Sequence, residues 1–187
     1  MSELAVVLAT YNEADNLGPL VEALEVLGED LCLFVVDDNS QDGTQGVAKE
    51  LSSTFNNLVI INRPGKFGLG SALRAGLAAA LATDARYVLT MDADCSHDPA
   101  EVPLLLEIAR SGRAGMVQGS RYVPGGGVRR WSLGRRLLSR AANLVYHWGA
   151  GAPHESTTNF RVFSRHAASV ILARARANGY EFMPEAT

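Results

Sequence analysis

Short apolar runs alternate along this chain with segments in which apolar residues recur every three or four positions, and this alternation constrains the fold more than any other feature. The apolar runs have the length of single strands, and they lie at Leu4–Ala9, Leu31–Val36, Leu58–Asn62, Tyr87–Met91 and Met116–Gly119. Strands that alternate with helices form parallel sheets covered by helices on both faces. We therefore predict an α/β fold built on a mostly parallel sheet.

Segments with helical periodicity separate or follow these runs. Their apolar faces comprise Leu17, Leu20, Val21, Leu24 and Leu27; the segment Gln45–Ser52; Leu69, Leu73, Leu77 and Leu81; and, after Pro99, Val102, Leu105, Leu106 and Ala109. A further segment, Ser132–Trp148, has an apolar and a basic stripe, and it fits either a helix packed on the core or one that binds an anionic interface. The chain stops just after a strand-like or loop segment, Gly179–Phe182, so we expect one domain over 1–187 that is truncated at its C-terminus.

The run Tyr87–Met91 ends in two aspartates one residue apart, Asp92 and Asp94. A buried strand delivers such side chains to the carboxyl edge of a parallel sheet, where open α/β folds bind ligands. Two neighbouring carboxylates repel each other unless a cation lies between them, and oxygen ligands favour Mg²⁺ or Mn²⁺. The pattern indicates a metal–diphosphate site, although a solvated turn with helix-capping aspartates would account for the same residues.

The charge of the chain is small overall and uneven in distribution. The 187 residues carry 17 basic and 20 acidic side chains, a net charge of −3, which argues against a nucleic-acid partner. No Asp or Glu occurs between Arg110 and Arg140, and this acid-free run contains Arg113, Arg121, Arg129, Arg130, Arg135 and Arg136. Such a run indicates a local anionic partner, either a phosphate group or a membrane surface.

The sequence also bears on the compartment. Cys32 and Cys95 lack metal-ligand spacing and indicate no disulfide framework, which fits a reducing cytosol. The start of the chain lacks the basic region of a signal peptide, and no apolar stretch is long enough to span a bilayer. We predict a cytoplasmic protein that contacts the cytoplasmic face of a membrane peripherally.

Two common nucleotide-binding patterns are missing. The first strand–helix turn, Ala9–Glu13, lacks the glycines that bring a dinucleotide close to the backbone, and the loop Gly65–Gly70 lacks the Gly-Lys-Ser/Thr of a P-loop. Acids instead follow three of the predicted strands, at Glu13, at Asp37 and Asp38, and at Asp92 and Asp94. In a doubly wound sheet these strand ends can converge on one crevice.

An ordered set of motifs connects these observations. The set comprises Ala9-Thr10-Tyr11-Asn12-Glu13, Val35-Val36-Asp37-Asp38-Asn39-Ser40-Gln41-Asp42-Gly43-Thr44, Gly68-Leu69-Gly70, Met91-Asp92-Ala93-Asp94-Cys95-Ser96-His97 and Gly119-Ser120-Arg121-Tyr122. Together these motifs resemble the inverting glycosyltransferases of family 2, and most closely the polyprenol-phosphate (dolichol-phosphate) mannose synthases. The resemblance implies the GT-A fold, which is Rossmann-like, and a nucleotide-diphosphate sugar as the donor.

The resemblance also implies roles for individual residues. It assigns nucleotide-sugar binding to Ala9, Tyr11, Glu13, Val36, Asp38, Lys66, Asp92, Ala93 and Asp94. Asp94 and Asp92 are the expected ligands of Mg²⁺ or Mn²⁺, and Arg121 is the expected partner of the leaving diphosphate or the acceptor phosphate. Arg135 and Arg136 are further candidates for the acceptor phosphate. Alternatives stay open for Asp37 as a buried structural acid, Tyr11 as a core residue and Lys66 as a solvated lysine.

The final motif departs from the pattern of the subgroup, Asp-x-Thr-Ser-Gly-Phe-Arg. Here Glu155 replaces the Asp and Asn159 replaces the Gly, and Ser96 stands where some relatives have Gln. A polyprenyl phosphate acceptor is already an anion, whereas a hydroxyl acceptor requires a base, for which Glu155 is the candidate. We expect mannose transfer from GDP-mannose to a polyprenyl phosphate. The alternatives are a transferase that uses a UDP-sugar and another acceptor, or a nucleotide-sugar-binding module that is inactive without a C-terminal part.

Overall fold

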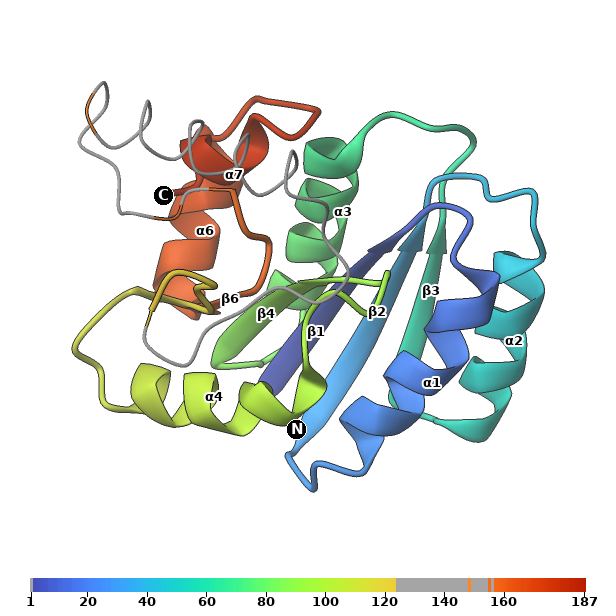
Figure 1. Ribbon diagram of the computed structural model, residues 1–187, viewed down its shortest axis with the longest axis horizontal. Coiled ribbons are helices and arrows are strands. Elements are labelled where there is room, and N and C mark those ends of the chain that lie inside the picture. The colour runs from blue at the N-terminus through green and yellow to red at the C-terminus, as the bar shows by residue number, and fades with distance from the viewer. Residues whose placement is uncertain (1, 124–147, 149–154, 156) are drawn as a thin grey trace.

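The computed structural model describes residues 2–123, 148, 155 and 157–187, and these residues contain a six-stranded sheet (Figure 1). The strands are β1 (Leu4–Thr10), β2 (Leu31–Asp37), β3 (Leu58–Asn62), β4 (Tyr87–Asp92), β5 (Met116–Gln118) and β6 (Arg161–Ser164), in the order β3-β2-β1-β4-β6-β5. The first four strands are mutually parallel, and β6 runs antiparallel to both β4 and β5. The mostly parallel sheet predicted from the sequence is thus confirmed.

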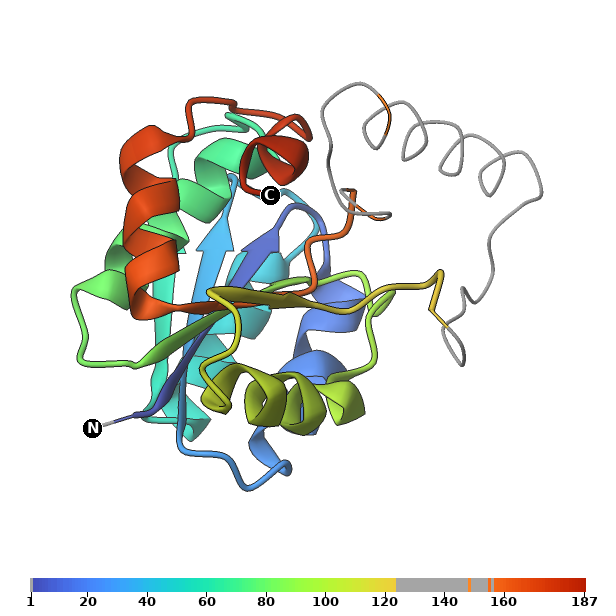
Figure 2. The same ribbon diagram turned by 90° about the vertical axis from the view of Figure 1, so that its left-hand side faces the viewer.

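Helices cover both faces of the sheet, as Figure 2 shows. They are α1 (Ala14–Glu25), α2 (Thr44–Thr54), α3 (Leu69–Leu81), α4 (Val102–Arg110), α6 (Arg165–Arg174) and α7 (Phe182–Glu185), with a 3-10 turn at Pro99–Glu101 before α4. Side chains alternate between the two faces along a strand. Leu4, Val6 and Leu8 of β1 therefore pack in the core with α1, α2 and α4, whereas Ala5 and Val7 pack with α3, α6 and α7.

A glycine allows α3 to approach the sheet closely. A Cβ atom at Gly76 would lie 2.2 Å from Cγ1 of Val7 and 3.2 Å from Cγ2 of Val36. Any larger residue at this position would push the helix away from β1 and β2. The close contact holds the N-terminal end of α3 beside the carboxyl ends of these strands, where the acidic motifs lie.

Two segments near the C-terminus were not fully predicted from the sequence. Arg161–Ser164 was not predicted as a strand, because its four residues are too short and too polar at both ends for an apolar-run signal, yet it forms β6. Gly179–Phe182, expected as strand or loop, is a turn that leads into α7. Of the predicted helix Ser132–Trp148, only Trp148 belongs to the described part of the chain, and its side chain is exposed. Within the described ranges, the helices lack the length and apolar character needed to cross a membrane.

Candidate functional site

The acidic motifs meet at the carboxyl edge of the sheet because their strands are parallel neighbours of β1. In the strand register Thr10 pairs with Asp37 on one side, and Ala9 pairs with Asp92 on the other. Glu13 follows directly in the turn between β1 and α1. The predicted convergence of the three strand ends is therefore present in the structure.

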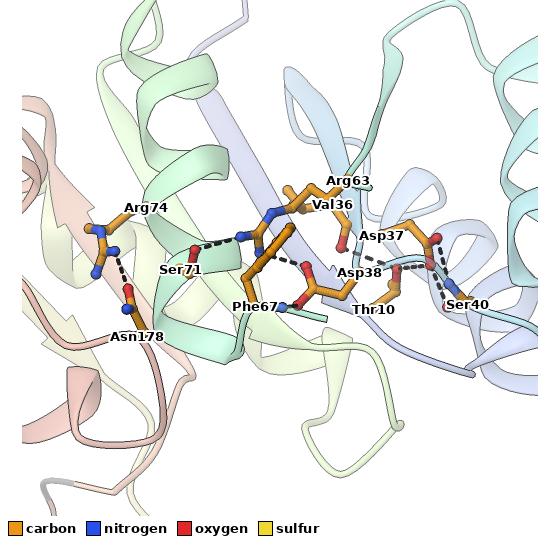
Figure 3. Close-up of polar contacts among 10 residues, drawn as sticks. All are labelled: Thr10, Val36, Asp37, Asp38, Ser40, Arg63, Phe67, Ser71, Arg74 and Asn178. Atoms are coloured by element: carbon orange, nitrogen blue, oxygen red, sulfur yellow. Dashed lines mark hydrogen bonds and ion pairs between the residues drawn. The ribbon is translucent and has the colours of Figure 1, made fainter. Parts of the chain in front are cut away.

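Asp37 is fully buried and bound entirely by protein donors (Figure 3). Its carboxylate accepts hydrogen bonds from the hydroxyl of Thr10 at 3.2 Å, the amide N–H and hydroxyl of Ser40 at 3.0 and 2.5 Å, and Nε2 of Gln45 at 2.8 Å. Four donors satisfy a buried carboxylate within the protein. Of the two interpretations left open by the sequence, the geometry favours a structural acid that shapes the turn after β2.

Asp38 is also buried, and it fastens the loop that follows β3. Oδ1 lies 2.5 Å from Nη1 of Arg63, and Oδ2 accepts the amide N–H of Phe67 at 3.0 Å (Figure 3). The guanidinium of Arg63 also donates to the hydroxyl of Ser71 and lies 5.1 Å from the centre of the Phe67 ring. Asp38 thus holds the loop against the predicted nucleoside site, and a nucleoside would have to share its oxygens with these donors.

Tyr11 and Lys66, two residues predicted to bind the nucleotide, contact each other. Nζ of Lys66 lies 3.6 Å from the centre of the Tyr11 ring, which is the geometry of a cation–π contact. The Tyr11 side chain is exposed, so it is not the core residue that the sequence left as an alternative. The pair places an aromatic face and a cation at the rim of the acidic site.

Asp92 is held in place by Asn159, which precedes β6, and by His97, which follows β4. Oδ1 accepts a hydrogen bond from Nδ2 of Asn159 at 3.0 Å, and the amide N–H of Asp92 donates to Nδ1 of His97 at 3.3 Å. The neutral His97 ring then carries its proton on Nε2, which lies 3.9 Å from Oδ2 of Asp92. The His97 ring stacks on Phe160 at a centroid distance of 5.0 Å. Burial lowers the pKa of His97 and raises the pKa of Asp92, and their mutual attraction opposes both shifts.

Asp94 is exposed and has few protein donors. Its Oδ1 accepts the amide N–H of Ser96 at 2.9 Å in a tight turn, in which Cys95 adopts a left-handed φ of 56°.

Burial raises the pKa of Glu13, and the negative charges of Asp94, Asp42 and Asp92 raise it further. Burial is the largest cause of this shift and the hydrogen bond from Asn16 opposes it, while the contribution of Asp94 and Asp92 reflects the negative charge that gathers at this edge of the sheet.

The two carboxylates fit a divalent cation of the kind that also binds phosphates. The described residues contain no cluster of three or more His, Cys, Asp or Glu side chains, so a site built from protein ligands alone does not exist among them. Mg²⁺ is usually held by one or two carboxylates together with water and substrate phosphates, which matches this arrangement. Asp94, with its exposed carboxylate, and the oriented Asp92 are the residues that would hold the ion.

Arg121 lies close enough to Asp92 and His97 for its charge to lower the pKa of both, and it is bound by Glu155. Nε of Arg121 lies 2.8 Å from Oε1 of Glu155, while Oε2 accepts the amide N–H of Arg121 at 2.8 Å and the hydroxyl of Ser120 at 2.9 Å. Nε2 of Gln118 donates to the Glu155 carbonyl at 2.6 Å. Glu155 is only 1% exposed. These contacts suit a residue that positions Arg121 and fit poorly with the predicted role of a base that meets an acceptor.

The glycine-rich loop serves as a packing surface for the C-terminal segment. A Cβ atom at Gly70 would lie 2.6 Å from the carbonyl oxygen of Ala177 and 2.7 Å from Cβ of Phe182. Arg74 donates to the Ala177 carbonyl and to the side chain of Asn178, as Figure 3 shows for the latter. Gly70 therefore does more than begin α3, because the absence of a side chain there also lets the backbone around residues 177–182 approach closely.

A buried arginine ties the same segment to the sheet. Arg161 opens β6, is 1% exposed, and donates from Nη1 to the carbonyl of Met183 at 2.7 Å. Burial lowers the pKa of Arg161 to about 10, and the charge of Glu155 partly opposes that shift. Arg161 therefore links α7 to the strand that follows Asn159.

The remaining predicted residues fall into two groups. Ala9 pairs in register with both Val36 and Asp92, whereas the side chains of Val36 and Ala93 are buried in the core. Arg135 and Arg136 lie outside the described residues. The sequence suggested His97, beside the aspartates, as a residue that supports them or caps a helix, and His97 does contact Asp92. The sequence reasoning missed Asn159 as a partner of Asp92 and Arg63 as the partner of Asp38. A signal existed only for Asn159, as a departure from the motif.

Comparisons with known proteins agree with this geometry. The family model described as glycosyl transferase family 2 matches residues 5–172. A polyprenol monophosphomannose synthase of Mycolicibacterium smegmatis is 37% identical over 185 residues, which cover 97% of this chain and 69% of that protein. A dolichol-phosphate mannosyltransferase of Pyrococcus furiosus is 37% identical over 145 residues, covering 76% of this chain and 40% of that protein.

Among solved structures, the fold resembles glucosyl-3-phosphoglycerate synthase from Mycobacterium tuberculosis in complex with Mn²⁺, uridine diphosphate and glucosyl-3-phosphoglycerate. The TM-score is 0.71 at 22% identity, and the match covers 98% of this chain and 63% of that one. At this identity the likeness establishes the fold alone, which is the GT-A fold predicted above. The chain therefore spans between about two fifths and two thirds of the length of these proteins.

Proposed function

The chain belongs to glycosyl transferase family 2, and on that premise we propose that it is an inverting transferase that moves a sugar, with mannose from GDP-mannose favoured, to a polyprenyl phosphate. The two relatives that are 37% identical support this choice, because one is named a polyprenol monophosphomannose synthase and the other a dolichol-phosphate mannosyltransferase. The paired carboxylates at the sheet edge support a nucleotide-diphosphate donor.

The observation that carries the proposed acceptor is the state of Glu155. A hydroxyl acceptor needs a group that takes its proton, whereas a phosphate monoester is already ionised near neutral pH. Glu155 is buried, its Oε2 accepts hydrogen bonds from the Ser120 hydroxyl and the Arg121 amide, and its Oε1 makes an ion pair rather than a hydrogen bond with Nε of Arg121. A site whose candidate base is committed to an arginine suits an acceptor that needs no base.

The reaction follows from the arrangement of the side chains. Asp94 and Asp92 would hold Mg²⁺ or Mn²⁺ against the donor diphosphate, and the ion when bound supplies charge neutralisation. An oxygen of the acceptor phosphate attacks the anomeric carbon from the face opposite the diphosphate, and the bond from that carbon to the diphosphate oxygen breaks, so the configuration inverts. Negative charge develops on the leaving nucleoside diphosphate. Arg121, which forms an ion pair with Glu155, would stabilise that charge.

The nucleoside part of the donor would lie between β1 and β2. Tyr11 offers an exposed ring, and Lys66 contributes a positive charge beside it. Glu13 and Asp38 supply carboxylate oxygens at the same strand ends. A polyprenyl acceptor resides in a lipid bilayer, so we include peripheral contact with the cytoplasmic face of a membrane, with Arg135 and Arg136 at the acceptor phosphate.

The test is transfer of labelled mannose from GDP-mannose to a short polyprenyl phosphate in detergent, with Mn²⁺ or with EDTA. We expect a lipid-linked mannose of inverted configuration, formed only with the metal, and loss of at least about 100-fold in turnover for Asp94→Ala. A parallel assay offers UDP-glucose and the unphosphorylated polyprenol. Transfer to the alcohol, or preference for the uridine donor, would refute the proposal. Binding of donor without any transfer would indicate a binding module instead.

A further inference from the structure

Asn159 occupies a buried position from which its side chain reaches the acidic site. Its side-chain amide donates to Oδ1 of Asp92 at 3.0 Å, and the residue is 3% exposed. Its backbone carbonyl accepts the hydroxyl of Thr90 at 2.8 Å. Thr90 and Asp92 lie two positions apart on β4, so their side chains share one face of the strand. Asn159 is thus fastened at both ends to the strand that carries Asp92.

The next residue completes the support of Asp92. The ring of Phe160 stacks on His97 with an interplanar angle of 11°, and His97 in turn accepts the amide N–H of Asp92. Gly119 makes room for this ring, since a Cβ atom there would lie 2.5 Å from Cδ1 of Phe160. Residues 159 and 160 therefore hold both the carboxylate and the backbone of Asp92.

We propose that Asn159 is a positioning residue, which fixes the Asp92 carboxylate in the orientation that receives the metal–diphosphate group of the donor. This inference rests on the proposed function and deepens it. The hydrogen bond from the Asn159 side chain to Oδ1 restrains rotation of the carboxylate, whose Oδ2 lies 3.9 Å from Nε2 of His97. Groups that orient a metal ligand typically change metal affinity or activity by about 10- to 100-fold when they are removed. In the part of the chain that the structure describes, the Asp94 carboxylate accepts a hydrogen bond only from the backbone amide of Ser96, so the orientation of the site depends on Asp92.

The test compares the affinity for GDP with Mn²⁺ and with EDTA, by calorimetry on the whole chain. For Asn159→Ala we expect the metal-dependent gain in affinity to fall about 10-fold or more, while the affinity in EDTA stays within about twofold of wild type. A role that is merely structural would lower both affinities together. Thr90→Val removes the hydroxyl that holds the Asn159 carbonyl, and it should reduce the metal-dependent gain in the same direction by a smaller factor.

The matched control is Asn57→Ala. Asn57 also donates to a carboxylate, that of Glu25 at 2.9 Å, and to the Leu31 carbonyl at the opposite end of the sheet. This variant should keep the full metal-dependent gain. If wild type shows the gain and both Asn159→Ala and Thr90→Val retain it, the inference is wrong while the proposed function stands. If wild type binds GDP and UDP equally with Mn²⁺ and EDTA, the metal-dependent function fails and the inference fails with it.

Discussion

The acidic pairs at the ends of β2 and β4 differ in what binds their oxygens, although both follow apolar strands that flank β1. Asp37 and Asp38 are buried, and the protein itself supplies donors to all four of their carboxylate oxygens. Asp92 is half-buried and accepts one hydrogen bond from a side-chain amide, that of Asn159, and Asp94 is exposed. Asp37 therefore shapes the turn after β2, and Asp38 can meet a ligand only by sharing oxygens that already accept protein donors. The second pair, by contrast, leaves oxygens and negative charge available to a ligand.

The comparison teaches that residue type and strand position do not by themselves identify a binding carboxylate. What separates the pairs is the set of donors that other parts of the chain bring to them. Ser40 and Gln45 donate hydrogen bonds to Asp37, and Arg63 forms an ion pair with Asp38. The turn after β4 leaves Asp94 with the amide of Ser96. Three experiments test this difference between the two pairs of aspartates.

The largest expected difference is in stability. Asp37→Ala removes the acceptor of four donors, and buried donors without partners are costly, so we expect the free energy of unfolding to fall by about 3 kcal/mol. Asp94→Ala alters an exposed turn and should change it by about 0.5 kcal/mol or less. Urea unfolding followed by circular dichroism measures both. Equal losses for the two variants would remove the distinction between the pairs.

A smaller effect is expected from the partner of Asp38. Arg63→Ala leaves a buried carboxylate with only the amide of Phe67, and we expect a loss of about 2 kcal/mol in the free energy of unfolding. Arg74→Ala is the control, because Arg74 also donates two hydrogen bonds but to neutral oxygen atoms, so its loss should be about half as large. The same urea titration applies. An Arg63→Ala protein as stable as wild type would show that the ion pair does not hold the loop.

The smallest effect concerns the pKa of Glu13, which burial and then the charges of Asp94, Asp42 and Asp92 raise. Asp94→Asn should lower this pKa toward the ordinary glutamate value, and Asp38→Asn should leave it unchanged. Because the folded pKa is raised, the stability contributed by the bound proton is present below the ordinary pKa and is lost as the pH rises through the raised one. Carboxyl NMR titration of both variants measures the shift, and a Glu13 pKa that ignores Asp94 would contradict the negative potential.

The sequence predicted the elements from β1 to β4 well. Leu58–Asn62 has the predicted bounds, β1, β2 and β4 extend one residue beyond theirs, and the four-residue spacing of leucines marked α3. These elements have strong local periodicity, because a strand or helix buried on the core must repeat its apolar residues. Prediction failed at β6, whose short run Arg161–Ser164 is a strand only because β4 and β5 pair with it on either side.

The parallel core, the strand ends that carry acids, and the residue types suited to a metal and a diphosphate could all be read from the amino-acid sequence. Which carboxylates remain available to a ligand depends on the folded chain, because the hydrogen-bond donors come from residues distant in the sequence. Asn159 reaches Asp92 across 67 positions, and Arg63 reaches Asp38 across 25. Glu155 is a further case, since its residue type suits a base for a hydroxyl acceptor, whereas the structure shows it buried in an ion pair with Arg121. The local sequence pattern indicates which chemistry a side chain is capable of, and its neighbours in the folded protein determine whether its polar atoms remain available for a ligand.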